Sequence, residues 1–267
     1  MFEAEDTLWW YRGLRLYLAD AFLRARLPPE ASVLDAGCGS GANMVLISNT
    51  WARVAGCDLA EEAVALARAR GPKRVFVADV NALPFRDGAF DCVLSADVFE
   101  AREVDEPRAV AELARVTRRG GQIIVVVAAY QFLLSAHDRA VHSVRRYTKT
   151  RARRAFAIPG LEVVRARYLF GVFLLPIVIF RLVRRLRPVA SRGTGPRSDL
   201  FTPPAPVNSL LYSLVILERL VARLIPIPFG TTILLELRRE SAAPRCGALA
   251  EGRARAPTRH STPRAGG

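Results

Sequence analysis

Residues 33–41, VLDAGCGSG, decide the fold of this chain. The run predicts a buried strand that ends in a glycine-rich turn, with a helix starting near Ala42. Glycines let the backbone take a positive φ and approach a ligand closely. The helix start presents free N–H groups and the positive end of its dipole, which bind the anionic or polar part of a nucleotide-like molecule. Asp35 would repel a pyrophosphate, but it suits a ligand that carries an amino group and a positive charge.

The glycine spacing is also compatible with a dinucleotide cofactor. Gly37, Gly39 and Ala42 satisfy the dinucleotide pattern G-x-G-x-x-G/A. Asp58 follows at about the ~20-residue distance at which an acid holds ribose hydroxyls. A dinucleotide site and an ordinary strand-to-helix turn are therefore both compatible with this loop alone.

Three more strand-like runs follow, at residues 53–58, 74–79 and 90–97, with an Ala-rich helical run at 61–70. This alternation predicts a parallel, doubly wound α/β sheet. Ligands of such sheets lie outside the carboxyl ends of the strands. One acid at a strand end is commonly a helix cap, but four acids in register predict a shared site. They are Asp35, Asp58, Asp79 and Asp97.

Four segments carry a family resemblance: VLDAGCGSG, GCDLAEEAVALAR, VADVNALPFRDGAFDCVLSADVFE and ELARVTRRGGQIIVVVAAY. On these segments, which lie in order over residues 31–130, the chain resembles class I S-adenosylmethionine-dependent methyltransferases of the type 11/12 subgroup. The NALPF-x-D-G-x-FD run is not a feature of dinucleotide dehydrogenases and counts against NAD. The resemblance implies a Rossmann-like, doubly wound seven-stranded sheet and S-adenosyl-L-methionine as the cofactor.

The resemblance also implies a donor site. The glycine loop would hold the methionine moiety, and the acid after the second strand would take the ribose hydroxyls. The acid after the third strand, with the backbone that follows it, would read the adenine amino group. The end of the fourth strand would border the methyl-transfer pocket. The expected cofactor-binding residues are Asp35, Gly37, Cys38, Gly39, Gly41, Asp58, Leu59, Asp79, Val80, Ser95, Asp97 and Arg12.

Arg12 enters this set because of the segment LWWYRGLR at residues 8–15. Related methyltransferases carry a similar W-W-x-R segment, so a tryptophan pair near Arg12 is expected to close over the cofactor carboxylate. The alternative is a helix that packs its aromatic side on the sheet, and this alternative is favoured for Trp9. An amphipathic stretch continues to Leu27, where two prolines end it.

Methyl transfer from a sulfonium requires alignment of the acceptor and exclusion of water, and it needs a base only when the acceptor loses a proton. Residues 137–148 follow the fifth expected strand and resemble an HD-x(3)-H-x(2)-RRYT segment of a family subgroup. His137 is the first choice of base, Asp138 would orient it, and His142 and Tyr147 are alternatives. A polar surface loop is the competing interpretation. Ala101 stands where many relatives have a histidine. Its absence favours His137 as the base, and it is also compatible with an inactive descendant that still binds the cofactor.

The chain has 267 residues, of which 51% are hydrophobic, and a net charge of +14. Its four cysteines show no metal-type spacing, so no metal is expected, and the acidic start argues against a secretory signal. A cytoplasmic protein is therefore expected. The predicted organisation is an N-terminal helical segment at 1–30, a methyltransferase core at 31–170, an apolar and basic insertion at 171–230, the last core strand at 231–240, and a disordered tail at 241–267.

The insertion separates the expected last two strands, at 161–168 and 231–237. Its apolar run is too short to span a bilayer, and four arginines follow it directly. Such a helix suits the interface of an anionic membrane, and the alternative is a lid over the acceptor pocket. The predicted function is methylation of a small or lipid-linked acceptor, with peripheral contact to the inner membrane face. A non-catalytic membrane-surface accessory protein is the alternative. RNA methylation is disfavoured, because the basic stretch at 139–154 lacks the interleaved aromatic platform that single-strand binders use.

Overall fold

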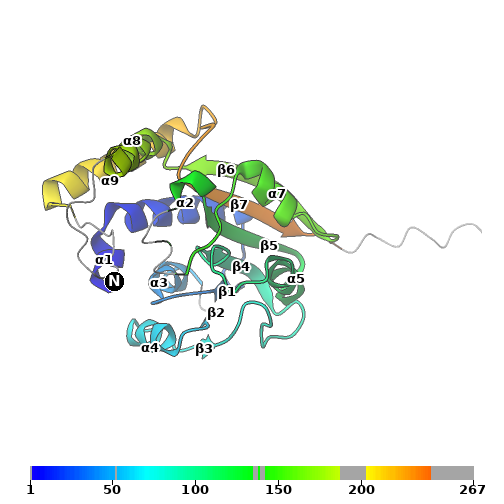
Figure 1. Cartoon of the computed structure of the whole chain (residues 1–267). Coiled ribbons are helices and arrows are strands. Elements are labelled where there is room, and N and C mark those ends of the chain that lie inside the picture. Colours follow the sequence, from blue (N-terminus) through cyan, green and yellow to red (C-terminus); the bar gives the residue numbers. More distant parts are fainter. Residues whose placement is uncertain (1, 52, 135–137, 139–141, 187–202, 242–267) are drawn as a thin grey trace, which may run out of the picture.

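The computed structural model describes residues 2–51, 53–134, 138, 142–186 and 203–241, and its centre is a seven-stranded sheet (Figure 1). The strand order is β3-β2-β1-β4-β5-β7-β6. The first five strands pair in parallel, and β7 is antiparallel to both β5 and β6. The predicted doubly wound α/β sheet is thus confirmed. The strands are β1 (Ser32–Ala36), β2 (Arg53–Asp58), β3 (Val75–Val77), β4 (Phe90–Ala96), β5 (Thr117–Ala128), β6 (Leu161–Leu169) and β7 (Thr232–Arg239).

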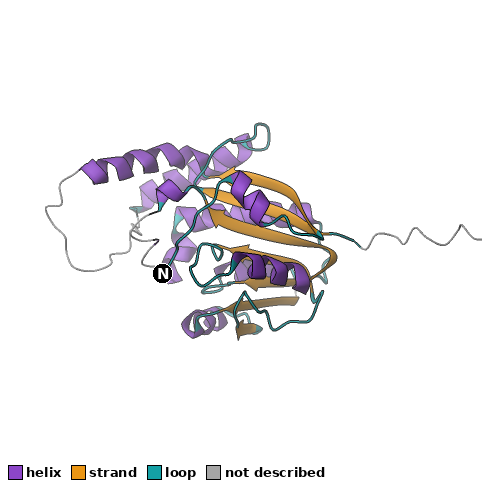
Figure 2. Cartoon of the chain, turned by 45° about the vertical axis from the view of Figure 1, so that its right-hand side comes forward, coloured by secondary structure: helices purple, strands orange, loops and turns teal. Residues whose placement is uncertain are grey.

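Helices cover both faces of the sheet, as Figure 2 shows. Along β5, Ile123 and Val125 point into the core beneath α5 and α7, while Ile124 and Val126 point into the core beneath α2, α3 and α4. Burial on both faces explains why the strands are almost continuously apolar. The helical elements are α1 (Phe2–Thr7), α2 (Trp9–Ala25), α3 (Ala42–Ser48), α4 (Glu61–Ala69), α5 (Glu106–Val116), η1 (Gln131–Leu133), α7 (Lys149–Ala155), η2 (Gly171–Phe173), α8 (Leu174–Leu186) and α9 (Ala205–Val221).

Strand β3 is shorter than the expected run at 74–79. Its ladder ends because the side chain of Asp79 accepts a hydrogen bond from the backbone N–H of Asn81, at 2.8 Å, and so turns the chain. Strand β5 is longer than expected and begins at Thr117, which pairs with Phe90 ahead of an irregularity in the register. Local turn chemistry, which hydropathy does not report, sets the end of β3.

Between β6 and β7 the described chain forms η2, α8 and α9, and α9 packs on α2. A Cβ on Gly13 would lie 2.8 Å from Cγ1 of Val215, so the two helices approach more closely than any larger residue allows. The buried carboxylate of Glu218 accepts hydrogen bonds from the Tyr17 hydroxyl at 3.0 Å and from the Val172 N–H at 2.9 Å. Packing and buried polar contacts therefore join the segment before β7 to the start of the chain.

Parts of the expected organisation lie outside the described residues. They are residues 187–202 of the expected insertion and residues 242–267 of the tail, which was expected to be disordered. Within the described ranges, no helix combines the length and the apolar character needed to cross a membrane.

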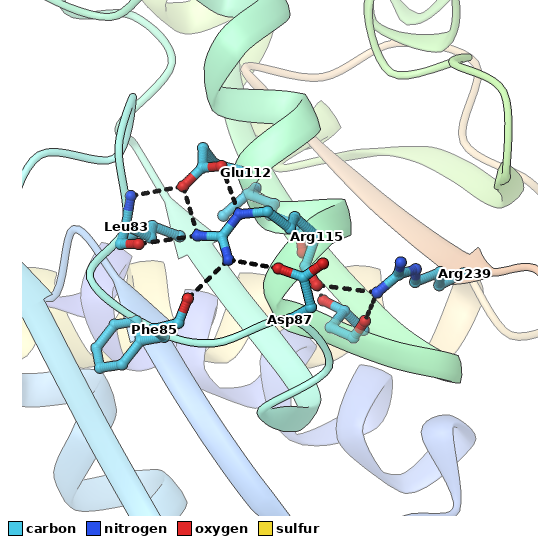
Figure 3. Close-up of polar contacts among 8 residues, drawn as sticks. Leu83, Phe85, Asp87, Glu112, Arg115 and Arg239 are labelled. Atoms are coloured by element: carbon cyan, nitrogen blue, oxygen red, sulfur yellow. Dashed lines mark hydrogen bonds and ion pairs between the residues drawn. The ribbon is translucent and has the colours of Figure 1, made fainter.

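The loop from β3 to β4 is held by one arginine of α5 (Figure 3). The Arg115 guanidinium donates hydrogen bonds to the carbonyl oxygens of Leu83 at 2.9 Å and Phe85 at 2.7 Å, and it pairs with Asp87 at 2.8 Å. Glu112 accepts from the same guanidinium and from the Leu83 N–H, and these bonds hold the pKa of Glu112 below its usual range. The NALPFRDG segment is thus fixed to a helix that packs beneath the sheet.

Replacing Arg115 with alanine removes charged hydrogen bonds to two backbone carbonyls and to Glu112. Since each charged bond contributes about 1.5–3 kcal/mol and Arg115 is partly exposed, R115A is expected to lower the free energy of unfolding by about 2 kcal/mol. Urea unfolding followed by circular dichroism measures this change. Exposed Arg119 on β5 provides the control, because R119A is expected to stay within about 0.5 kcal/mol of the wild type. Equal stabilities of the two variants would contradict the anchoring role.

Candidate functional site

A cavity of about 470 Å³ opens at the carboxyl ends of β1, β2 and β4. It brings together most of the residues predicted to bind the cofactor. Helices α1 and α2 form one wall of the cavity, and Arg12 is the one residue of the predicted cofactor-binding set that lies on these helices. The predicted residues that line it are Gly37, Cys38, Gly39, Asp58, Leu59, Asp79, Val80 and Asp97. Those that do not line it are Asp35, Gly41, Ser95 and Arg12.

The glycine loop has the conformation that its sequence predicts. Gly37, Gly39 and Gly41 all have a positive φ, and a Cβ on Gly37 would come within 2.1 Å of the Val98 side chain. The N–H groups of Gly37 and Cys38 donate to the Cys57 carbonyl at 2.8 and 2.9 Å, which ties the loop to β2. Gly41 is the N-cap of α3. The loop therefore needs glycine for its backbone path as well as for contact with a ligand.

Asp58 stands at the carboxyl end of β2 and organises the floor of the cavity. Its Oδ2 atom accepts from the Gly39 N–H at 2.8 Å, and its Oδ1 atom accepts from the Ala60 N–H at 3.0 Å. Because a carboxylate oxygen has two lone pairs, both atoms can accept a further bond from a hydroxyl of a ligand. Asp79, held by its bond from Asn81, provides a second carboxylate on the same wall.

Asp35 is a fully buried acid, and neither of its carboxyl oxygens has a hydrogen-bond partner. Burial, with a contribution from Asp58, raises the pKa of Asp35 to about 7. Among the described residues, five carboxylates and one cation, Arg15, line the cavity. A ligand with a positive charge and an amino group would offset this excess of negative potential, so the site fits S-adenosylmethionine and disfavours a pyrophosphate. The five carboxylates are Glu5, Asp58, Asp79, Asp97 and Glu103.

The N-terminal helices close one side of the cavity. Glu5 of α1 accepts a short hydrogen bond from the hydroxyl of Ser40 in the glycine loop and pairs with Arg70 at 3.1 Å. Trp10, Tyr11 and Arg15 of α2 line the same side. The sequence prediction missed Glu5 and Arg15, because no motif marks a residue that reaches a site from another part of the fold.

Arg12, the arginine chosen from the sequence, lies elsewhere. Its guanidinium lies over the ring of Tyr212 in α9, 3.9 Å from the ring centroid. Trp9 packs against Phe173, with ring centroids 4.3 Å apart, as the structural alternative for this residue expects. The role of Arg12 toward the cofactor carboxylate stays a prediction, and Arg15 is the arginine that faces the cavity.

Three of the expected catalytic residues, Asp138, His142 and Tyr147, are described by the structure and do not line the cavity. Asp138 is buried and pairs with Arg146 at 2.6 Å. His142 is exposed, with its Nδ1 atom 3.1 Å from the Glu103 carboxylate. Tyr147 is fully buried, and its hydroxyl bonds Glu106 at 2.5 Å. His137, the first choice of base, lies outside the described residues.

Two expected residues lie at or just after the carboxyl end of β4. Ser95, on β4, is fully buried and its hydroxyl oxygen has no hydrogen-bond partner. Asp97, two residues later, faces the cavity with a φ of 56°. In the described chain, no cluster of three or more His, Cys, Asp or Glu side chains is arranged to hold a metal ion.

Comparison with known proteins identifies the central part of the chain. Residues 34–125 match the family described as a methyltransferase domain. The probable tRNA methyltransferase 9B of Mus musculus is 38% identical over 105 residues, which are 39% of this chain and 23% of that protein. The demethylmenaquinone methyltransferase of Beutenbergia cavernae is 37% identical over 99 residues, or 36% of this chain and 40% of that protein. This chain therefore matches less than half of the length of either relative.

The fold also matches a solved structure. Geranyl diphosphate C-methyltransferase from Streptomyces coelicolor A3(2), in complex with Mg²⁺, geranyl diphosphate and S-adenosyl-L-homocysteine, has a TM-score of 0.59 and is 17% identical. The match covers 86% of this chain and 78% of that one. It shows that the sheet and its flanking helices have the class I methyltransferase arrangement.

Replacing Asp58 with alanine leaves the Gly39 and Ala60 N–H groups unpaired and removes the expected partner of the ribose hydroxyls. Loss of about two charged hydrogen bonds predicts at least a ~100-fold weaker affinity for S-adenosylhomocysteine by isothermal titration calorimetry. Glu61, exposed in the first turn of α4, is the control, and E61A is expected to bind as the wild type does. Undiminished binding by D58A would remove the donor assignment.

Asp35 makes the stability of the protein depend on pH. Its pKa is raised on folding, so the folded state binds more protons than the unfolded state between pH ~4 and about 7, and stability falls as pH rises through that window. D35N removes the titrating carboxyl group, so the free energy of unfolding of this variant is expected to vary less with pH than that of the wild type. Urea titrations at several pH values measure it, with D87N, at an exposed acid, as the control. Parallel pH profiles for D35N and the wild type would contradict the assignment.

Proposed function

We propose that this chain, whose residues 34–125 belong to the methyltransferase domain family, transfers a methyl group from S-adenosylmethionine to a small or lipid-linked acceptor. The observation that carries the proposal is the acidic cavity at the carboxyl edge of the sheet, where the glycine loop, Asp58 and Asp79 meet. The donor supplies an activated methyl group on a positively charged sulfur, and the residues of the chain bind and orient it.

Each part of the cavity has a task under this proposal. The loop at 37–41 accommodates the methionine end, since its glycines allow close backbone approach and the carboxylates of the lining supply negative potential. Asp58 accepts the ribose hydroxyls, and Asp79 with Val80 lies beside the adenine. Trp10 and Tyr11 of α2, together with Glu5 of α1, cover the cavity and exclude water from the transfer.

We further propose that α8, α9 and the turn after α9 rest on a membrane. Figure 1 places both helices at the same end of the molecule, with α9 supported by α2. Leucine and isoleucine side chains project from them into solvent, and Leu224 is 86% exposed. An apolar helical face on a chain of net charge +14 suits the interface of an anionic membrane. The apolar face consists of Leu175, Ile179, Leu182, Leu210, Leu217, Leu220, Val221, Leu224 and Ile225.

A membrane location favours a lipid-linked acceptor. Helix α2 connects the two regions, because Leu14 lines the cavity while Gly13 contacts Val215 of α9. Two of the similar proteins are named for demethylmenaquinone and for geranyl diphosphate. An acceptor with an apolar tail would place its reacting end in the cavity and leave its tail near the apolar face.

RNA methylation is the second candidate, because one similar protein is named as a probable tRNA methyltransferase and the chain is strongly basic. The cavity weighs against it, since five carboxylates repel a phosphate backbone. A non-catalytic accessory protein with the same fold is the remaining alternative, and it would bind the donor without turnover.

Changing the apolar face tests the membrane proposal. The variant L175D/L217D/L224D is expected to lose co-sedimentation with vesicles of phosphatidylcholine and phosphatidylglycerol, which the wild type retains. Withdrawing each leucine from the interface costs about 1.5–3 kcal/mol, or about tenfold or more in partitioning. The control, L23D/L66D, alters two leucines that are also exposed but lie on α2 and α4.

The same proteins are then assayed for binding to tRNA over a range of salt concentrations. Binding of the wild type to anionic vesicles alone supports the membrane proposal. Strongly salt-dependent binding to tRNA, with none to vesicles, would overturn it in favour of an RNA acceptor.

A further inference from the structure

Asp97 holds a constrained position in the middle of the carboxyl edge. It is the first residue after β4, next to β1, and its φ of 56° is in the left-handed region that non-glycine residues avoid. Its N–H donates to the Val126 carbonyl at 3.0 Å, so the pairing of β4 with β5 holds this conformation. The strained backbone turns the residue into the cavity, where it forms part of the lining.

Two ionisable side chains, Glu100 and Arg146, interact electrostatically with Asp97. Glu100 is almost fully buried; its Oε1 atom accepts from the Ala128 N–H, and its Oε2 atom has no partner. Arg146 donates to the Ala129 carbonyl at 3.2 Å and to Asp138 at 2.6 Å, and its Nε atom is unpaired. The chain from 142 to 147 holds this group in place, since the Glu100 carbonyl accepts from the Val144 N–H at 2.8 Å.

The pKa values of two acids in this group, Asp97 and Glu100, depend on each other. Asp97 is exposed to the open cavity, but desolvation by the surrounding protein raises its pKa to about 6, against the opposing effect of Arg146. Burial, reinforced by the charge of Asp97, raises the pKa of Glu100 to about 8. Tyr11 faces the group from α2, and burial with nearby carboxylates raises its pKa to about 12. The pKa of Asp97 therefore lies below those of Glu100 and Tyr11, so Asp97 is the acid of this group that ionises first as the pH rises.

We propose that Asp97 is the proton acceptor of the methyl transfer, and that Arg146 and Glu100 act as positioning residues behind it. The inference rests on the proposed function. The acceptor is an amine or a hydroxyl: its lone pair forms the new bond to the methyl carbon, and the carbon–sulfur bond breaks with its electron pair left on sulfur. The N–H or O–H proton passes to a carboxylate oxygen of Asp97, which later releases it to water.

Position separates Asp97 from the other candidate bases in the described chain. Asp138 and Tyr147 are buried in structural contacts, and His142 points to solvent beside Glu103. Asp97 is the described candidate that both faces the cavity and has a pKa just below neutrality, as a general base requires. The negative cavity also favours an acceptor that is neutral or cationic where it reacts.

The first test needs no acceptor. Protein labelled with carbon-13 at the aspartate carboxyl carbons is titrated by NMR, and the Asp97 signal is assigned by its loss in D97N. A midpoint near about 6 is expected, unchanged in E100Q because Glu100 is already protonated there, and raised in R146M because a cation is lost. A midpoint at the ordinary aspartate value of about 4 would overturn the inference.

The second test uses S-adenosylmethionine with a tritiated methyl group and a total lipid and metabolite extract as the source of acceptor. D97N is expected to lower the rate of transfer by about 100-fold or more, with a much smaller effect on the affinity for S-adenosylhomocysteine. The wild-type rate should rise with pH through the Asp97 titration and then level, and this bend should be absent in D97N.

The outcomes separate the inference from the proposed function. Transfer by the wild type and equally by D97N overturns the role of Asp97 alone. Loss of transfer in D97N without loss of the pH bend also overturns it, because that result assigns Asp97 to charge stabilisation of the donor. No transfer by the wild type in any extract overturns the proposed function, on which the inference rests.

Discussion

Repulsion between carboxylates at one edge of the sheet is the constraint on which the rest of the site depends. Parallel strands bring their carboxyl ends together, and here β1, β2 and β4 each end at or near an aspartate, with Asp79 beyond β3. The chain stabilises these charges in different ways. Asp58 accepts two backbone N–H groups, whereas Asp35 has no partner and retains its proton more readily. A basic protein thus contains an acidic cavity, and the ligand that completes it is expected to carry positive charge.

The fold and the floor of the cavity could be predicted from the sequence because both depend on short-range patterns. The loop at 37–41, the acid after β2 and the turn at Asp79 follow from residues that are neighbours in the chain. The wall formed by Glu5 and Arg15 could not be predicted in this way. These residues reach the cavity only because α1 and α2 fold across its opening, and nothing in their own spacing indicates that contact.

The residues that act on the acceptor could likewise not be predicted from short-range patterns. Residues 137–148 are predicted to hold the catalytic groups because they are rich in polar groups beyond the end of a strand and resemble a segment of a family subgroup. In the structure, Tyr147 and Asp138 instead hold buried contacts with Glu106 and Arg146. Asp97 was expected to border the methyl-transfer pocket, but its left-handed backbone and its proximity to Glu100 and Arg146 are three-dimensional properties. A residue type shows what a side chain can do, whereas its environment determines its charge.

The contact between α2 and α9 has a consequence for how the protein is made. Tyr17 and Asp20 bond to Glu218 and Arg219, about two hundred positions later in the chain, and β7 follows later still. During synthesis α2 therefore leaves the ribosome long before α9 exists, and the apolar side of α2 stays uncovered while the parallel strands form. Contacts of such long range slow folding and expose intermediates to aggregation. The wall of the cavity is thus completed late, and a chain interrupted before residue 205 would have the glycine loop without α9, the helix that supports that wall.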